Sequence, residues 1–277
     1  KLFTFTADDF SRVRSLIYRR AGISLSDSKQ EMVYSRLARR LRVKGMQAFA
    51  TYLDDLESGR DPEEWEAFTN ALTTNLTSFF REAHHFPILA EHARSAGAPY
   101  SVWCSASSTG EEPYSIAMTL CEAFNTLTPR VNILATDIDT NVLESAALGI
   151  YAGDRLNNLS EPRVRRFFLK GKGEQAGKVR VRPELRQLVN FQPLNLLSAS
   201  WPTGGPFDAI FCRNVMIYFD KPTQSRILAR FVPLMKPHGL LFAGHSENFM
   251  YVSDHLKLRG KTVYELDGAA SGMRRAS

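Results

Sequence analysis

The sequence predicts an α/β protein in which an all-helical N-terminal domain precedes an open parallel sheet with a small antiparallel insert. Three observations predict this arrangement. Up to about residue 90 the apolar residues have helical spacing, and after Gly97 short apolar runs alternate with amphipathic segments. A glycine-rich stretch around residue 172 then interrupts the alternation. A chain of 277 residues is long enough for two domains of unequal size.

Four helices are predicted in an N-terminal domain that covers residues 1–75, because apolar residues recur there every three or four positions. Asp8 and Asp9 lie in the first turn of the first helix, where the helix dipole favours acidic side chains. Gly45 ends the second helix, since glycine readily adopts the left-handed backbone that ends a helix. The predicted ranges are 7–20, 27–44, 49–56 and 62–72.

The parallel sheet is predicted within residues 99–277, and residues 76–98 are expected to link the two domains and to contribute to a ligand site. Strands that alternate with helices form a parallel sheet covered on both faces. The expected strands are 101–106, 131–137, 188–192, 207–212, 239–243 and 262–266, and the expected helices are 111–124, 141–148 and 222–235.

One stretch of this domain breaks the alternation of strands and helices. Gly171, Gly173 and Gly177 lie between two short apolar runs, and glycines in that position are typical of a β-hairpin. We therefore expect a small antiparallel β-subdomain, inserted at about residues 160–186.

Composition and charge narrow the class of protein. The net charge of +6 predicts an acidic partner, either a protein or a nucleic acid. The apolar runs are too short to span a bilayer, and the start has no signal-peptide core. The three cysteines have no CxxC spacing, which favours a reduced cytoplasmic protein without a metal site. Because the first residue is not Met, the true N-terminus is undefined.

The ends of the first two strands predict a nucleoside site, because ligands of open parallel sheets bind beyond the carboxyl ends of the strands. Gly110 lets a ligand approach the turn closely, although an ordinary tight turn explains it equally well. Asp137 suits ribose hydroxyls, with a helix cap as the alternative. Glu111 and Glu112 would repel a pyrophosphate, which favours adenosyl-methionine over a dinucleotide or ATP.

Four long blocks resemble, in order, the signature blocks of the chemotaxis receptor glutamate methyltransferases. The blocks are Asn70-Ala-Leu-Thr-Thr-Asn-Leu-Thr-Ser-Phe-Phe-Arg-Glu82, Ser105-Ala-Ser-Ser-Thr-Gly-Glu-Glu-Pro-Tyr-Ser115, Ala135-Thr-Asp-Ile-Asp139 and Cys212-Arg-Asn-Val-Met-Ile-Tyr-Phe-Asp220. The match continues through Gly244-His-Ser-Glu-Asn248 and covers nearly the whole chain. It implies a Rossmann-like class I methyltransferase sheet domain and S-adenosylmethionine as the cofactor, with S-adenosylhomocysteine as the product and no metal.

The resemblance also implies roles for individual residues. The implied cofactor-binding residues are Asn75, Thr77, Arg81, Glu112, Asp137, Asn195, Leu196, Arg213 and Asn214. Arg81 and Tyr218 are the candidate catalytic residues that orient the acceptor, with a salt bridge and a core phenol as the alternatives. Ser107 and Ser108 stand where some relatives have Cys or Ala, a minor departure where only a small side chain is needed.

The activity that the resemblance implies is transfer of a methyl group to glutamate side chains of chemotaxis receptors. A glutamate with an ordinary pKa near ~4.3 is ionised at neutral pH, so no general base is required. The chain has no evident Ser-His-Asp or Cys-His set, which agrees with this chemistry. Alignment of the reacting atoms is then the main catalytic contribution that we expect.

Receptor methylation regions are helical and acidic, so basic residues of the second helix would steer and dock them, unless they form only a solvated face. These residues are Arg36, Arg39, Arg40 and Arg42. In the family, a glycine-rich hairpin loop binds the receptor's C-terminal tail as an added strand, and Gly171, Gly173 and Gly177 match it. An ordinary surface hairpin is the alternative. Nothing in the sequence demands an oligomer, so a monomer is expected.

Three other functions are weaker alternatives. A nucleic-acid methyltransferase would suit the positive charge, but an Asn-Pro-Pro-Tyr-like turn is missing at Arg213-Asn-Val-Met216. The protein could instead be an adaptor that binds the cofactor without turnover. A replaced Asp137 or an altered glycine turn would favour that function, but both are intact. A metal site at His84-His85 is disfavoured because adjacent helical histidines point in different directions.

Overall fold

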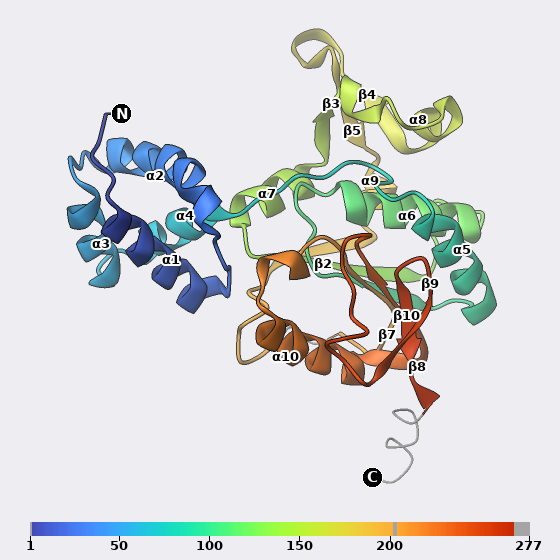
Figure 1. The fold of residues 1–277 in the computed structure, drawn as a ribbon. Coiled ribbons are helices and arrows are strands. Elements are labelled where there is room, and N and C mark those ends of the chain that lie inside the picture. Colours follow the sequence, from blue (N-terminus) through green and yellow to red (C-terminus); the bar gives the residue numbers. More distant parts are fainter. Residues whose placement is uncertain (1, 202–203, 269–277) are drawn as a thin grey trace.

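The structure is a computed structural model that describes residues 2–201 and 204–268. It confirms the predicted fold class: a helical N-terminal domain, an open α/β sheet domain and a small antiparallel sheet that projects from it (Figure 1). In the described part of the chain no helix is both long and apolar enough to cross a membrane.

Four α-helices form the N-terminal domain, and their bounds lie close to the predicted ranges. Thr6 and Asp9 form a capping box at the start of the first helix, and Gly22 and Gly45 end the first two in left-handed backbone. Val13, Ile17 and Leu37 are fully buried in the domain's core. The helices are α1 (Ala7–Ala21), α2 (Gln30–Lys44, preceded by a 3-10 turn at Asp27–Lys29), α3 (Phe49–Glu57) and α4 (Pro62–Leu72).

A buried carboxylate joins three of these helices. Glu64 of α4 accepts hydrogen bonds from Arg40 Nε (3.0 Å) and Nη2 (2.7 Å) on α2, and from the Tyr52 hydroxyl (2.8 Å) on α3. Arg36 donates to the carbonyl oxygens of Ala71 (3.3 Å) and Thr73 (2.7 Å). Arg36 and Arg40 therefore hold α2 against α4, whereas a free docking face was predicted for them.

The main sheet has seven strands in the order β6-β2-β1-β7-β8-β10-β9. The first five in this order are parallel, and β10 runs antiparallel to both β8 and β9. The order reverses between β1 and β7, which creates the crevice where parallel sheets bind ligands. The strands are β1 (Tyr100–Cys104), β2 (Val131–Asp137), β6 (Val189–Pro193), β7 (Phe207–Cys212), β8 (Met235–Ala243), β9 (Leu256–Gly260) and β10 (Val263–Leu266).

Helices cover both faces of this sheet, so its central strands are apolar on both sides. Val102 of β1 faces the core formed by α5 (His85–Ala96) and α6 (Glu111–Ala123). Its neighbour Trp103 faces the opposite core, which α10 (Lys221–Phe231) closes. A further helix, α7 (Thr140–Leu148), contacts α6 through the Tyr114 hydroxyl, which donates to the Ala146 carbonyl (2.6 Å).

The antiparallel insert is larger than the predicted range of 160–186. Its three strands have the order β3-β5-β4, and β3 begins at residue 150. Strand β3 is only three residues long and pairs with β5 across more than twenty-five residues of sequence, so this pairing was not visible in the sequence. The elements are β3 (Ile150–Ala152), α8 (Glu161–Phe167), β4 (Phe168–Lys170), β5 (Lys178–Val181) and α9 (Pro183–Arg186), with 3-10 turns at Gly153–Leu156 and Gly173–Gln175.

Two further elements of the sheet domain were not predicted. Helix α5 lies in the range expected to be a linker. It was missed because its apolar residues Phe86, Leu89 and Ala93 are spread among histidines and a proline. Strand β9 has a mostly exposed pattern at the sheet edge, where alternation of apolar and polar residues is weak.

The Glu64 cluster gives a prediction for stability. Glu64→Ala leaves Arg40 and the Tyr52 hydroxyl without their shared acceptor, and breaking a largely buried ion pair costs about 3 kcal/mol. We expect urea denaturation to show a loss of about this size, with Asp54→Ala as the control, since Asp54 makes an exposed bond to Arg12. Equal losses for the two variants would contradict the role given to Glu64.

Candidate functional site

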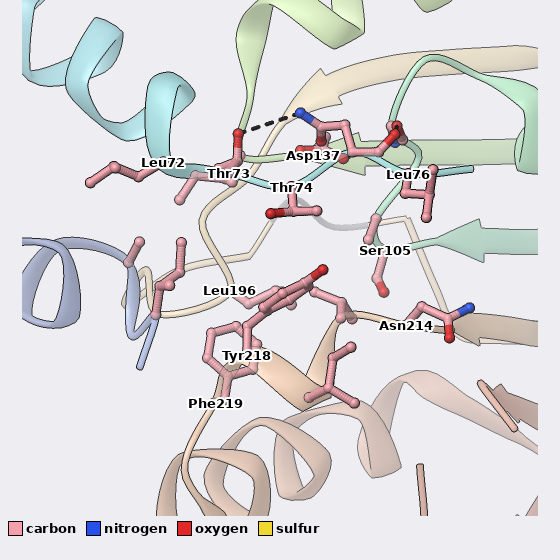
Figure 2. A pocket seen from close by; sticks show the side chains of 18 of the residues that line it. Leu72, Thr73, Thr74, Leu76, Ser105, Asp137, Leu196, Asn214, Tyr218 and Phe219 are labelled. Atoms are coloured by element: carbon pink, nitrogen blue, oxygen red, sulfur yellow. Dashed lines mark hydrogen bonds between the residues drawn. The ribbon is translucent and has the colours of Figure 1, made fainter. Parts of the chain in front are cut away.

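A cavity of about 370 Å³ lies at the carboxyl ends of β1, β2 and β7, where the helical domain meets the sheet domain (Figure 2). A cavity of this size suits a small-molecule cofactor. The structure brings together in its lining all the residues predicted to bind cofactor or orient the acceptor: Asn75, Thr77, Arg81, Glu112, Asp137, Asn195, Leu196, Arg213, Asn214 and Tyr218.

Asp137 ends β2 with its carboxylate almost fully buried, at 8% exposure. Its Oδ2 accepts the Ser108 N–H (2.8 Å) and its Oδ1 accepts the Asp139 N–H (2.9 Å). Burial raises the pKa of Asp137 to about 6. The Ile138 N–H also acts on this carboxylate, and because a carboxylate has about four acceptor positions, room remains for a hydroxyl donor.

The alternative role of Asp137 as a helix cap is excluded, because Asp139 caps α7. The Asp139 side chain accepts the N–H groups of Asn141 (3.0 Å) and Val142 (3.4 Å). Its other oxygen accepts the Asn75 side-chain amide (2.8 Å), so the cap also fixes the segment that joins the two domains.

Of the two interpretations of Gly110, the structure supports the tight turn, because Gly110 does not line the cavity. Gly110 has φ of 103°, and a Cβ there would lie 2.7 Å from the Tyr151 hydroxyl and 3.0 Å from Ala146 Cβ. The glycine is thus required by packing against α7 and the insert. The residues of this region that line the cavity are Ser105, Ala106 and Ser108.

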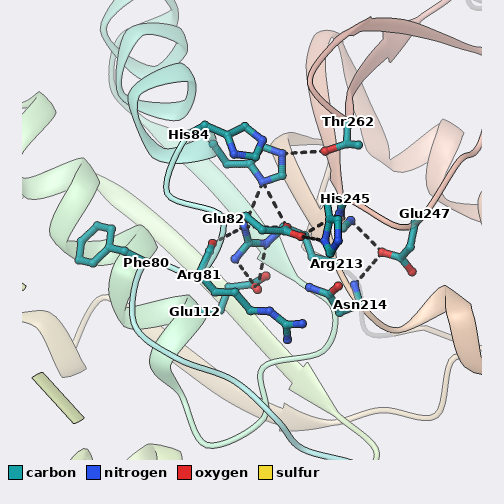
Figure 3. Close-up of polar contacts among 12 residues, drawn as sticks. Phe80, Arg81, Glu82, His84, Glu112, Arg213, Asn214, His245, Glu247 and Thr262 are labelled. Atoms are coloured by element: carbon teal, nitrogen blue, oxygen red, sulfur yellow. Dashed lines mark hydrogen bonds and ion pairs between the residues drawn. The ribbon is translucent and has the colours of Figure 1, made fainter. Parts of the chain in front are cut away.

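Glu112 opens α6 at the cavity wall and forms a buried ion pair with Arg213 (Figure 3). Its Oε2 accepts from Arg213 Nε (3.1 Å) and Nη2 (3.0 Å), while its Oε1 accepts weakly from the Cys104 thiol (3.5 Å). The Arg213 Nη1 also donates to the Arg81 carbonyl (2.7 Å). Arg213 is only 4% exposed, so its guanidinium acts within the wall of the cavity.

Several other predicted side chains are held by protein groups. The Asn195 amide donates to the Arg20 carbonyl (2.7 Å) and its Oδ1 accepts the Leu197 N–H (3.0 Å), which fixes one side of the cavity to α1. The Arg81 Nη1 donates to the Leu76 carbonyl (3.0 Å), within its own segment. Tyr218 is half-buried and lies on the opposite wall (Figure 2).

Sequence reasoning missed the contribution of the helical domain to this cavity. Ile23, Ser24 and Leu25, which follow α1, line it, and the Ser24 N–H donates to the Tyr218 carbonyl (2.8 Å). Gly22 permits this approach, since a Cβ there would lie 2.8 Å from the Leu197 side chain. In the sequence, Gly22 indicates the end of a helix, but it does not indicate a contact with a residue almost 200 positions away.

The histidine pair is part of the packing around Arg213. The His85 Nε2 lies 3.0 Å from the carbonyl of Lys261 and 3.0 Å from the Thr262 hydroxyl, and its Nδ1 lies 3.0 Å from Arg213 Nη1. Burial, reinforced by the Arg213 charge, lowers the pKa of His85 to about 4. His85 is therefore neutral at physiological pH, and both ring nitrogens have protein neighbours.

The predicted receptor-contacting residues lie away from the cavity. Arg39 and Arg42 are exposed on α2, in contrast to Arg36 and Arg40. In the insert, Gly173 (φ 59°) and Gly177 (φ 83°) adopt left-handed backbone. A Cβ at Gly171 would lie 2.0 Å from the Gln175 carbonyl, so these three positions do require glycine.

The strand order, the reversal between β1 and β7 and the acidic residue at the end of β2 are typical of an open α/β domain that binds a nucleoside-containing cofactor beyond its strand ends. Two family models match the chain: the CheR methyltransferase all-alpha domain over residues 8–73, and its SAM-binding domain over residues 75–264. The chain belongs to the CheR methyltransferase family.

Curated relatives of this family match almost the whole chain. A chemotaxis protein methyltransferase of Klebsiella aerogenes is 63% identical over 93% of this chain and 89% of its own length. One from Escherichia coli K12 is 58% identical, over 93% and 90% of the two chains. Chemotaxis protein methyltransferase 2 of Pseudomonas aeruginosa is 55% identical, over 95% and 94%.

The raised pKa of Asp137 gives a prediction for cofactor binding. Ribose hydroxyls bind an ionised carboxylate more strongly than a protonated one, since charge-assisted bonds are roughly twice as strong. Protonation below the pKa of about 6 should therefore weaken the binding of S-adenosylhomocysteine. Calorimetry should show a constant affinity from about pH 7 to 8 that falls, by at most about tenfold per unit, towards pH 5. Asp137→Asn should bind weakly with no such fall, and an equal fall in that variant would contradict this assignment.

Proposed function

We propose that this chain transfers the methyl group of S-adenosylmethionine to glutamate side chains of chemotaxis receptors and so forms glutamate methyl esters. The observation that carries the proposal is the convergence of Asp137, Arg81 and Tyr218 on one cavity, in a chain of the CheR family. When bound, S-adenosylmethionine supplies an electrophilic methyl group, which bonds to the carboxylate oxygen as the bond to sulfur breaks and sulfur keeps the electron pair.

The residues of the cavity suit the two ends of this cofactor. Asp137 would accept hydrogen bonds from the ribose hydroxyls, while Leu196 would contact the adenine region. Glu112, already neutralised by Arg213, would present a wall of low net charge beside the amino-acid end. Asn75 and Thr77 would hold that end from the segment between the domains.

The acceptor carboxylate needs orientation but no deprotonation, since glutamate is ionised at neutral pH. Arg81 and Tyr218 face the cavity from two different segments, and we assign them the orientation of this carboxylate. Lys29 also lines the cavity and is exposed, so the approach carries positive charge towards an acidic substrate. Alignment is then the main source of rate acceleration.

Two surfaces outside the cavity are proposed to bind the receptor. Arg39 and Arg42 of α2 would steer an acidic helical region by a field that salt screens. The insert would bind the receptor's C-terminal tail as an added strand. Residues 161–186 hold nine Lys or Arg against three Asp or Glu, so the insert favours an acidic tail. A further cavity of about 350 Å³, lined by Gly171, Gly177 and Lys178, lies beside β4 and β5.

The nature of the product tests the proposed reaction. Methyl-labelled S-adenosylmethionine should label a receptor cytoplasmic fragment, and mild base should release the label as methanol, because carboxyl esters hydrolyse readily. Asp137→Asn serves as the control with a damaged cofactor site. Label that resists base, or label that enters RNA or DNA supplied in parallel, would contradict glutamate O-methylation.

The tail-binding role predicts a selective defect. Gly171→Ala places a Cβ against the Gln175 carbonyl and must move the loop of the insert, while the cavity at β1 and β2 is untouched. We expect this variant to methylate a tail-bearing receptor several-fold more slowly than the wild type and a tailless receptor equally fast, since tethering raises local concentration. Gly204→Ala is the control, because open space surrounds that glycine and its backbone is not left-handed. Equal rates with and without the tail in the wild type would exclude tail binding.

A further inference from the structure

The turn that follows β8, Gly244-His-Ser-Glu247, lies beside Glu82 and Asn214 (Figure 3). The residues that line the cavity do not include Gly244, His245 or Glu247. The turn nevertheless contacts two segments that do line it, which are Asn214–Tyr218 and Asn75–Glu82, the second by way of Glu82.

Glu247 contacts the first segment. Its carboxylate is only 5% exposed, and Oε1 accepts the Asn214 N–H (2.6 Å) and the Gly244 N–H (2.8 Å). The backbone N–H groups of Met216 and Ile217 also lie close enough to lower its pKa, although burial raises it more strongly. One oxygen of this buried carboxylate therefore joins the amides of Asn214 and Gly244, and charge-assisted bonds of this kind are stronger than neutral ones. Among the described residues the other oxygen, Oε2, has no hydrogen-bond partner.

The bond from Glu247 reaches Asn214 at a point where the backbone is left-handed, a conformation that asparagine adopts more readily than most non-glycine residues. The φ of Asn214 is 59°, in the left-handed region that non-glycine residues rarely adopt. Gly244 leaves no room for a side chain: a Cβ there would lie 2.5 Å from Asn214 Oδ1 and 2.9 Å from Glu247 Oε1. The turn and the end of β7 are thus fitted to one another.

His245 connects the same turn to the second segment. Its backbone N–H donates to Glu82 Oε1 (2.8 Å), and its ring Nδ1 lies 2.9 Å from the same oxygen. Glu82 itself has φ of 54°, and its Oε2 lies 3.5 Å from Arg213 Nη1, the atom that donates to the Arg81 carbonyl. The two walls that carry Arg81 and Tyr218 are therefore joined by one four-residue turn.

We propose that the turn Gly244–Glu247 positions the methyl-transfer site, with Glu247 as the positioning residue that holds the Asn214–Tyr218 segment. This inference rests on the proposed function for its kinetic consequence. Glu247 touches neither cofactor nor acceptor in this account and acts through Asn214 and Tyr218. A displacement of a reacting group by about 1 Å costs up to about 10²-fold in rate. Loss of the Glu247 carboxylate should therefore lower kcat more than it weakens cofactor binding.

The test compares Glu247→Ala and Glu247→Gln with the wild type. We expect Glu247→Ala to lower kcat for receptor methylation about 10- to 100-fold. The KM and the calorimetric Kd for S-adenosylhomocysteine should change much less. Glu247→Gln keeps an acceptor oxygen and should recover part of kcat. In both variants, hydrogen–deuterium exchange of the amides at 214–218 should be faster, which reports on the contact without reference to activity.

Asp208→Asn is the matched control for a lost buried carboxylate. Asp208 is 2% exposed at the other end of β7, where it accepts the Ser101 N–H (2.8 Å) and pairs with Lys236 and His238. We expect this variant to lose stability but to keep kcat. Wild-type kcat in a folded Glu247 variant, or an equal kcat loss in Asp208→Asn, overturns the inference. If Glu247→Ala does not fold, Glu247→Gln decides. If the wild type forms no methyl ester, the proposed function fails, and amide exchange at 214–218 still tests the contact.

Discussion

The rest of the structure depends on the burial of one guanidinium group, that of Arg213 at the end of β7. A buried charge is tolerated only when it is paired and its donors are satisfied. Glu112 at the start of α6 supplies the countercharge, and the Arg81 carbonyl and the His85 ring supply further partners. These partners fix the starts of α5 and α6 relative to the central strand. They also place the Arg81 segment beside the cavity, so one ion pair links the packing of the sheet domain to the shape of the site.

The site is assembled from segments that are far apart in the sequence. The ends of β1, β2 and β7 form its floor, and the turn after α1 closes it from the helical domain. Hydrogen bonds to backbone carbonyls hold these segments together: the Ser24 N–H donates to the Tyr218 carbonyl, and the Asn195 side-chain amide donates to the Arg20 carbonyl. This arrangement suits chemistry in which alignment matters more than proton transfer.

Most of the fold could be predicted from the sequence, because periodicity and glycine signals agreed over long stretches. Helix α4 and strands β2 and β7 have the predicted bounds. Helix α5 and strands β3 and β9 were missed, since they are short or exposed or have mixed composition. For the site, strand ends alone indicated Asp137, and the family resemblance supplied the other residues. Other features became visible only in the tertiary structure, because the interacting groups are distant in sequence. They include the inward bonds of Arg36 and Arg40 and the packing around Gly110. They also include the contacts of Glu82, His245 and Glu247.

A crystal structure of this protein with S-adenosylhomocysteine bound would show whether the cavity is the methyl-transfer site. In that complex the ribose hydroxyls should donate to the Asp137 carboxylate, and the sulfur should face the space between Arg81 and Tyr218. The Arg213–Glu112 pair should remain intact in that complex. A ligand whose ribose lies away from Asp137, or whose sulfur points away from Arg81 and Tyr218, would contradict the account.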